Sequence, residues 1–370
     1  MFAPLELVPG MLLRNRVVMA PMTTWAANDD GTVSDAEDAY YRRRVQDVGL
    51  VITGCTHVQA NGVGFTGEFS ADDDRFIPSL RKLATAAKSG GARAVLQIFH
   101  AGVKTLPTLV SDVVAASAVA GENGPFAEAI MPRALSGEEV RGVISAFADA
   151  TRRAIEAGFD GVELHGAHGF LLQNFFSPHT NRRSDQWGGS LENRMRFPLA
   201  VVAEIKRTIA DHADRPFALG YRISVEEAVE GGLQIDESLQ LITRLIEGRI
   251  SYIHASLGNV LEQKPATGGE QTIVSRLRAH IDGRVPLIAA GQVKTPAQAE
   301  SALDMGLSLV AVGQGLVINP DWVALARAGR DSDIQVSISV SDVASAAIPA
   351  KLWTIMDATT GWFNVIRPGN

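Results

Sequence analysis

The sequence predicts a (β/α)8 TIM barrel, in which eight parallel strands alternate with eight helices. Short apolar runs alternate with longer amphipathic runs eight times along the chain. The short runs are continuously hydrophobic, as strands buried on both faces are. The alternative is a doubly wound open sheet, but no G-x-G-x-x-G follows the first strand, and that is the dinucleotide signal such a sheet needs most.

The predicted strands are rich in Val, Ile, Leu and Ala. They are Val17–Ala20, Leu50–Thr53, Ala94–Ile98, Gly161–Leu164, Ala218–Ile223, Tyr252–Ala255, Pro286–Ala290 and Leu309–Val312. The predicted helices are Asp35–Val48, Pro78–Ser89, Gly137–Gly158, Leu191–His212, Asp236–Glu247, Ile273–Ile281, Pro296–Met305 and Pro320–Ala328. The third begins with Ser136-Gly-Glu-Glu139, the pattern of a capping box.

Two segments lie outside this repeat. Ala101–Ala134, rich in Ala, Gly and Pro, is a long excursion after the third strand, and we expect it to cross one face of the barrel. Residues 1–330 are predicted to form the barrel, and residues 331–370 a C-terminal extension. This tail carries Trp353, Trp362 and Phe363, and we expect a packed extra helix, a lid or an oligomer contact.

Composition excludes several classes of function. The net charge is −7 and no basic block is present, which argues against a nucleic-acid partner. Cys55 is the single cysteine, so neither a disulfide framework nor a Cys-ligated iron–sulfur cluster is possible. The N-terminus has no apolar run long enough for a signal peptide or membrane span. We expect a cytoplasmic protein that acts on a small molecule and could form a homo-oligomer.

Polar residues gather just after the predicted strands, where barrel enzymes place their chemistry. His165 and His168 follow strand four, Gln97 lies near the end of strand three, and Arg222 lies near the end of strand five. Together they suit a planar heteroaromatic ring that carries carbonyls and a delocalised negative charge. The histidines could instead be two satisfied polar residues or part of a metal site, but no third ligand at a convincing spacing supports zinc.

Glycine turns follow the last two strands. Gly291-Gln292 comes after strand seven and Gly313-Gln314 after strand eight. In this fold such turns bind phosphate through backbone N–H groups. The sequence therefore favours a phosphorylated ligand on this side of the barrel.

The same stretches resemble the Old Yellow Enzyme family of FMN-dependent ene-reductases, over about residues 2–330. The motifs that carry the resemblance are APMT (Ala20–Thr23), QIFHAG (Gln97–Gly102), HGAHGF (His165–Phe170), SPHTNRRSDQWGGSLENR (Ser177–Arg194), YRIS (Tyr221–Ser224), AAGQ (Ala289–Gln292) and VGQ (Val312–Gln314). The resemblance implies FMN as cofactor, NADH or NADPH as reductant, and an electron-poor alkene as acceptor.

It also implies a role for each matching residue. His165 and His168 would form the oxyanion site, and Trp25 and Phe170 would bind the acceptor beside them. Thr23 would bond the flavin O4, Gln97 the pyrimidine part of the ring, and Arg222 the region near N1 and O2. The full set expected to bind FMN is Ala20, Pro21, Met22, Thr23, Cys55, Gln97, Arg222, Gly291, Gln292, Gly313 and Gln314.

Two positions depart from the family pattern. Gln314 stands where the family has a phosphate-binding arginine, and we expect nearby Lys294 to compensate. Phe170 stands where the family has a tyrosine that protonates the α-carbon of the substrate, so this acid is missing.

Some expectations concern pairing rather than chemistry. Loop Asn181–Arg194 should hold the fourth connection against the barrel rim, with Asp185, Glu192 and Arg194 paired among themselves. Arg222 could be a buried ion-pair partner of Glu226 or Glu227.

Three other functions are open at this point. One is an FMN barrel enzyme with other redox chemistry, such as demethylation or dehydrogenation, which the absence of the acid makes more plausible. Another is a flavin-free, phosphate-binding lyase or isomerase. The last is an FMN-binding carrier or sensor without turnover.

Overall fold

The computed structural model describes residues 1–124 and 129–367, and it confirms the predicted barrel. Within these residues, eight parallel strands close into a ring, because β7 pairs both with β4 and with β10. All eight overlap the predicted strands. In ring order they are β10 (Gly161–Gly166), β11 (Ala218–Ile223), β12 (Tyr252–Ser256), β13 (Leu287–Ala290), β14 (Leu309–Val312), β3 (Val17–Met19), β4 (Leu50–Ile52) and β7 (Arg93–Phe99).

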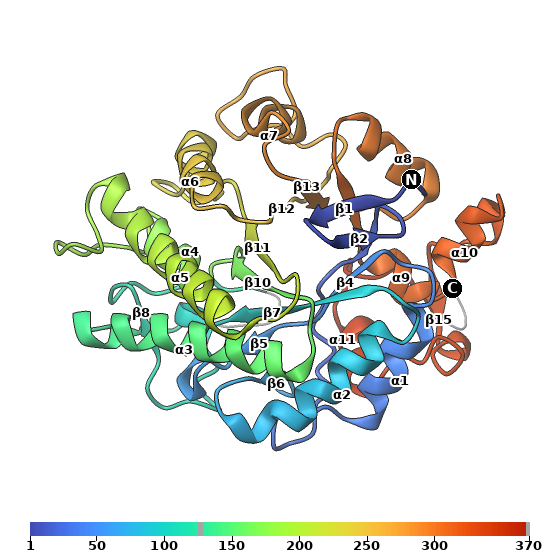
Figure 1. Cartoon of the computed structure of the whole chain (residues 1–370), viewed down its shortest axis with the longest axis horizontal. Coiled ribbons are helices and arrows are strands. Elements are labelled where there is room, and N and C mark those ends of the chain that lie inside the picture. The colour runs from blue at the N-terminus through green and yellow to red at the C-terminus, as the bar shows by residue number, and fades with distance from the viewer. Residues whose placement is uncertain (125–128, 368–370) are drawn as a thin grey trace.

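Helices surround these strands (Figure 1). Those that alternate with them are α1 (Asp35–Arg44), α2 (Ile77–Lys88), α3 (Gly137–Ala157), α5 (Leu191–His212), α6 (Ile235–Glu247), α7 (Ile273–Ile281), α8 (Pro296–Asp304) and α10 (Trp322–Arg327). The predicted capping box is present at the start of α3, where Ser136 and Glu139 bond each other's backbone N–H groups. Short helices α4 (Leu171–Phe176) and α9 (Gln314–Ile318) and the 3-10 helices η1 (Ala60–Gly62), η2 (Asp74–Phe76) and η3 (Gly102–Lys104) were not predicted.

Helix α1 is shorter than predicted, because it ends at Arg44 rather than Val48. The guanidinium of Arg14 donates hydrogen bonds to the backbone carbonyls of Val45, Gln46 and Val48. These carbonyls are therefore satisfied by a side chain from elsewhere in the chain, and the segment needs no further helical turn.

A hairpin precedes the barrel and packs against one apolar core. Strands β1 (Leu5–Val8) and β2 (Met11–Leu13) pair antiparallel. Their residues Leu7, Met11 and Leu13 share a buried cluster with barrel residues such as Val18 and Ile288. A much larger cluster joins the remaining faces of the strands to the helices. The polar residues described below therefore stand above an apolar floor.

The excursion after β7 is partly ordered by one short strand pair, in which β8 (Val114–Ala115) pairs with β9 (Arg133–Ala134). In the connection after β4, strand β5 (Thr56–His57) pairs with both β6 (Phe69–Ser70) and β7. The predicted excursion Ala101–Ala134 includes residues 125–128, which lie outside the described residues. Gly124, just before them, reaches the mouth of the barrel.

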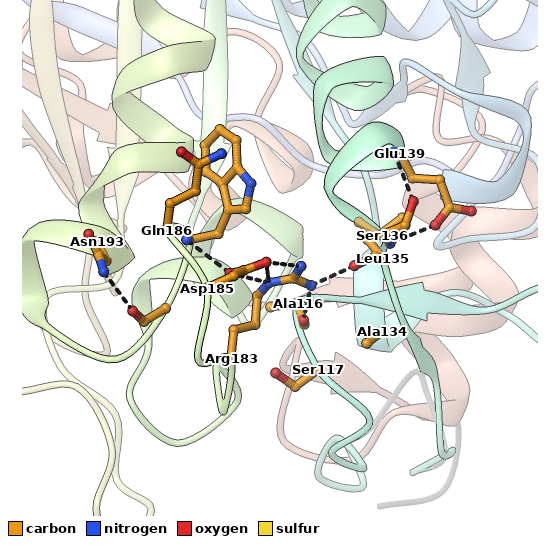
Figure 2. Close-up of polar contacts among 12 residues, drawn as sticks. Ala116, Ser117, Ala134, Leu135, Ser136, Glu139, Arg183, Asp185, Gln186 and Asn193 are labelled. Carbon is orange, nitrogen blue, oxygen red and sulfur yellow. Dashed lines mark hydrogen bonds and ion pairs between the residues drawn. The ribbon is translucent and has the colours of Figure 1, made fainter.

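Arg183 fastens the loop after β10 to this excursion (Figure 2). Its guanidinium donates to the carbonyls of Ala116 and Leu135 at 2.9 and 2.6 Å and forms an ion pair with Asp185. The expected pairing of Asp185, Glu192 and Arg194 among themselves was wrong. Arg194 forms an ion pair with Glu237 at the start of α6, and Asp185 forms one with Arg183. The loop is held by neighbouring elements rather than only by itself.

The C-terminal segment packs against the first helix of the barrel (Figure 1). It contains η4 (Asp331–Asp333), β15 (Ile338–Ser339), η5 (Val340–Asp342), α11 (Ala350–Ala358) and β16 (Val365–Ile366). The guanidinium of Arg44 donates to the carbonyl of Ala346, and Leu352 and Met356 of α11 are buried. Predicted tail residues 368–370 lie outside the described residues. No helix in the described part of the chain combines the length and apolar character needed to cross a bilayer.

Candidate active site

A cavity of about 570 Å³ opens at the carboxyl ends of the barrel strands. Every residue that the sequence assigns to the cofactor and the acceptor lines it. These are Ala20, Pro21, Met22, Thr23, Trp25, Cys55, Gln97, His165, His168, Phe170, Arg222, Gly291, Gln292, Gly313 and Gln314. A cavity of this size fits the usual range for cofactor sites.

His165 and His168 lie side by side, with ring centroids 5.0 Å apart. His165 is the second-last residue of β10, and its Nδ1 accepts the backbone N–H of Ala167, so Nε2 carries the proton of the neutral ring. His168 follows in a left-handed conformation, with φ of +59°, and its Nε2 lies 2.6 Å from Ser256 Oγ. A spacing of three residues brings both rings to one cavity only because the chain turns sharply here.

Both imidazoles are held neutral. Burial lowers the pKa of His165 well below 6.5, and the positive charge of Arg222 lowers it further. His168 opens to the cavity, which would favour a normal pKa, but desolvation and the cations Arg222 and Lys104 act in the opposite direction. The pair therefore consists of uncharged N–H donors at neutral pH.

Arg222 interacts electrostatically with a buried carboxylate, Glu163, that the sequence did not single out. Glu163 accepts from Gln97 Nε2 at 2.7 Å and lies 2.9 Å from His254 Nδ1. Burial alone would raise the pKa of Glu163, but the charge of His254, its hydrogen bond and the charge of Arg222 together lower it. Glu163 is therefore ionised and balances the guanidinium of Arg222.

The strand register explains how these groups meet. Glu163 is level with Gln97 of β7, and Arg222 is level with His165 of β10 and His254 of β12. The alternative pairing of Arg222 with Glu226 or Glu227 was wrong. Arg222 Nη2 donates to Ser256 Oγ at 3.1 Å, and Glu227 instead accepts from side chains of the loop after β10.

The wall formed after β3 and β4 contains Met22, Thr23 and Cys55. Burial raises the pKa of the Cys55 thiol to about 12, so the thiol is neutral, and it lies 3.5 Å from Gln97 Oε1. Gly54 is required here, because a Cβ would lie 2.6 Å from the carbonyl oxygen of Met22. The two strand ends thus touch through backbone atoms.

At the far end, the turn after β13 packs closely against the loop that follows β12. A Cβ on Gly291 would lie 2.5 Å from the carbonyl oxygen of Leu257, and Gln292 has a φ of +58°. Gln314 Nε2 donates to the carbonyl of Trp362 at 2.5 Å, so this amide holds the C-terminal segment. Lys294 lies beside a second cavity with Trp362 and Arg367, and not in the main one. Its expected compensating role has no support from this placement.

Aromatic rings form the remaining walls. Phe170 is 4% exposed and lies 4.7 Å from the His165 ring and 4.9 Å from the Phe99 ring, centroid to centroid. Trp25 makes edge contacts with Phe65 at 5.6 Å and with Trp362 at 5.9 Å. Like His168 and Gln292, Trp25 has a positive φ, which non-glycine residues adopt mainly where surrounding structure enforces it.

Sequence analysis missed several lining residues. Lys104 comes two positions after the QIFHAG motif, and Ser256 directly follows predicted strand six, so both could have been found by reading one or two residues further. Phe65 and Gly124 come from connections without a recognisable pattern. Trp362 was noted only as a tail residue, because nothing local indicates that it reaches the cavity.

The chain is similar to known proteins in both sequence and fold. Residues 1–333 match the sequence profile of the NADH:flavin oxidoreductase / NADH oxidase family. A probable NADH-dependent flavin oxidoreductase of Bacillus subtilis is 41% identical over 98% of this chain and 97% of its own length. The NADH:fumarate oxidoreductase of Klebsiella pneumoniae is 40% identical over 95% of this chain, but the chain spans only 38% of that longer relative.

A solved structure shows the same fold. The Old Yellow Enzyme homologue of Zymomonas mobilis superposes with a TM-score of 0.79, covering 92% of this chain and 95% of the other, at 24% identity. Together with the family match, this sets aside the flavin-free lyase or isomerase.

Proposed function

Because this chain belongs to the NADH:flavin oxidoreductase / NADH oxidase family, whose cofactor is FMN, we propose that it reduces electron-poor alkenes such as α,β-unsaturated carbonyls. NADH or NADPH would be the reductant. FMN, when bound, would take a hydride from the nicotinamide and pass it to the acceptor. The protein's own residues would bind, orient and polarise the reactants.

The lining residues fit FMN. Gln97 and Arg222 present amide and guanidinium N–H groups at the base of the cavity, and the buried Nε of Arg222 has no hydrogen-bond partner among the described residues. A flavin carbonyl would supply that partner. Gly291 and Gly313 line the cavity, where their backbone would face a phosphate, and Met22 and Thr23 would line the edge of the ring.

The acceptor would lie beneath His165 and His168. Negative charge develops on the carbonyl oxygen of an enone when a hydride adds to its β-carbon. Two neutral imidazole N–H groups stabilise that oxygen as an oxyanion hole does. His168 would exchange its contact with Ser256 for the carbonyl oxygen. The observation that carries this proposal is the adjacent, uncharged His165 and His168 in the cavity that also contains Gln97 and Arg222.

Anaerobic spectroscopy of the purified protein tests the proposal. We expect a yellow protein that NADH or NADPH bleaches, and we expect cyclohexenone or N-ethylmaleimide to restore the colour with formation of the saturated product. Protein that neither contains nor takes up FMN would contradict the cofactor assignment. Bleached protein that oxygen restores but no activated alkene restores would instead indicate an oxidase or another redox function.

A further inference from the structure

Lys104 lies at the mouth of the cavity beside the histidine pair. It ends η3, directly after β7, and lines the cavity with His168 and Phe170. A Cβ placed on Gly169 would lie 3.1 Å from Lys104 Cε and 3.7 Å from Nζ. The ammonium therefore rests against the backbone that joins His168 to Phe170.

Two contacts fix η3 to the helix that Phe170 begins. The backbone N–H of Val103 donates to Asn174 Oδ1 at 3.1 Å, and the N–H of Leu171 donates to the carbonyl of His100 at 3.0 Å. Phe170 is the N-cap of this helix, α4. Lys104 and Phe170 therefore keep a defined relation to each other, although they are 66 positions apart in the sequence.

The ammonium of Lys104 has no hydrogen bond or ion pair within residues 1–124 and 129–367. Partial burial lowers its pKa below the ordinary 10.5, while the charge of Glu122 acts in the opposite direction. A proton on this nitrogen is thus released more readily than from a surface lysine.

Other titratable groups that line the cavity cannot easily give up a proton. The Cys55 thiol has a pKa of about 12, His165 and His168 are neutral imidazoles, and Arg222 stays a guanidinium. Phe170 has no proton to give. Of the described lining residues, Lys104 alone is a cationic acid that can readily lose its proton.

We propose that the ε-ammonium of Lys104 protonates the α-carbon of the acceptor, the step that Phe170 cannot perform. The inference rests on the proposed alkene reduction. When a hydride adds to the β-carbon, the C=C electron pair moves toward the carbonyl and forms an enolate held by His165 and His168. The enolate then takes a proton from Lys104 Nζ at its α-carbon, the C=O bond re-forms, and the neutral amine regains a proton from water.

The kinetic test uses Lys104→Met in the FMN-loaded protein, because methionine keeps the length of the chain and loses the acid. A placed general acid contributes about 10²–10⁴-fold to a step that needs it. In anaerobic stopped-flow, we expect reoxidation by cyclohexenone, relative to flavin reduction by NADH in the same variant, to fall at least about tenfold. Phe170→Tyr added to Lys104→Met should restore most of the loss, because a hydroxyl then stands on the neighbouring wall. Lys264→Met, at an exposed lysine, is the matched control.

A second measurement does not depend on hydride transfer. The oxidised protein is incubated with cyclohexanone in D₂O, and exchange at the α-carbon is followed by NMR. We expect the wild type to exchange faster than Lys104→Met. Wild-type-like reoxidation in Lys104→Met, or a loss that Phe170→Tyr does not restore, would overturn the assignment.

The two proposals fail in different ways. If cyclohexenone never reoxidises the wild-type protein, the proposed function is wrong. In that case α-carbon exchange that is equal in the wild type and Lys104→Met also overturns the role of Lys104, whereas exchange lost in the variant supports it.

Discussion

At the residue scale, the site depends on which side chains are kept uncharged. His165 and His168 are neutral because they lie in a desolvated mouth with the cations Arg222 and Lys104. A protonated imidazole would add charge that the site cannot neutralise, since the nearby carboxylate Glu163 already balances Arg222. The same cations that keep the imidazoles neutral would also attract a developing enolate.

The first prediction concerns the histidine pair. Phenols mimic the enolate, so replacing both His165 and His168 with Ala should abolish their tight binding while FMN stays bound. Removing one oxyanion donor typically costs about 10²–10³-fold in catalysis, and we expect at least a tenfold loss of phenol affinity. The measurement is the charge-transfer absorbance on titration with 4-chlorophenol. His280→Ala, on helix α7, serves as the control, and unchanged absorbance in the double variant would refute the assignment.

At the element scale, two connections hold the mouth of the barrel together, and each depends on one side chain. Arg183 links the loop after β10 to the residues that directly follow β8 and β9, and Gln314 links the start of α9 to the C-terminal segment. Both side chains bond backbone carbonyls of distant segments. Substitutions there should affect the stability of a connection more than the chemistry of the site.

Arg183→Lys tests the first connection. An ammonium cannot replace the planar fork that serves Ala116, Leu135 and Asp185 at once. We expect the free energy of unfolding to fall by about 1–3 kcal/mol, since at least one buried carbonyl loses its partner. Urea unfolding followed by circular dichroism measures this. Among the described residues, the Arg182 side chain donates only to the carbonyl of His179, so Arg182→Lys should change stability much less. Equal effects of the two substitutions would contradict the role of Arg183 in holding this connection.

Gln314→Met tests the second connection. Methionine keeps the shape but cannot donate to the carbonyl of Trp362, and one such hydrogen bond is worth about 0.5–1.5 kcal/mol. Amide exchange around Trp362 should therefore become roughly 2–10-fold faster, as measured by mass spectrometry. Gln335→Met, in the same segment, is the control. Unchanged exchange together with weaker FMN binding would show that Gln314 serves the phosphate rather than the tail.

At the scale of the whole molecule, one buried acid makes stability depend on pH. Burial raises the pKa of Glu37, in the first turn of α1, from 4.5 to about 8, although the hydroxyl of Thr24 donates to it. Its Oε2 is buried with no hydrogen-bond partner among the described residues. The folded protein therefore holds a proton on Glu37 that the unfolded chain releases above its ordinary pKa.

The sign of the effect follows from this linkage. Because the folded pKa is raised, the contribution of Glu37 is fully present below 4.5 and is lost as pH rises toward about 8. Each pH unit in that window costs at most about 1.4 kcal/mol. Glu37→Gln, which stays neutral, should therefore gain stability relative to the wild type between about pH 5 and about pH 8.

Urea unfolding at several pH values measures this difference. Glu300→Gln, at an exposed carboxylate of α8, should follow the wild type throughout. A constant difference between Glu37→Gln and the wild type across the window would show that Glu37 does not carry the pH dependence.

The sequence by itself determined the barrel and most of the cavity. Each buried parallel strand is a continuous apolar run, so all eight could be located within one or two residues. The ends of those runs indicated His165, His168, Gln97 and Arg222, because a closed barrel brings its carboxyl ends to one mouth. These inferences use only local pattern and the geometry of the fold class.

Tertiary structure decided how the site residues interact. Glu163 and His254 lie inside strands, where only register shows that they face Arg222 and Gln97. Arg194 was expected to pair locally but meets Glu237, and Gln314 meets Trp362, which is 48 positions away. Lys104 lies next to Gly169, the neighbour of Phe170, only because η3 packs on α4. Such contacts join segments far apart in the chain, and neither propensity nor periodicity encodes their partners, because both act over a few residues while packing acts through space.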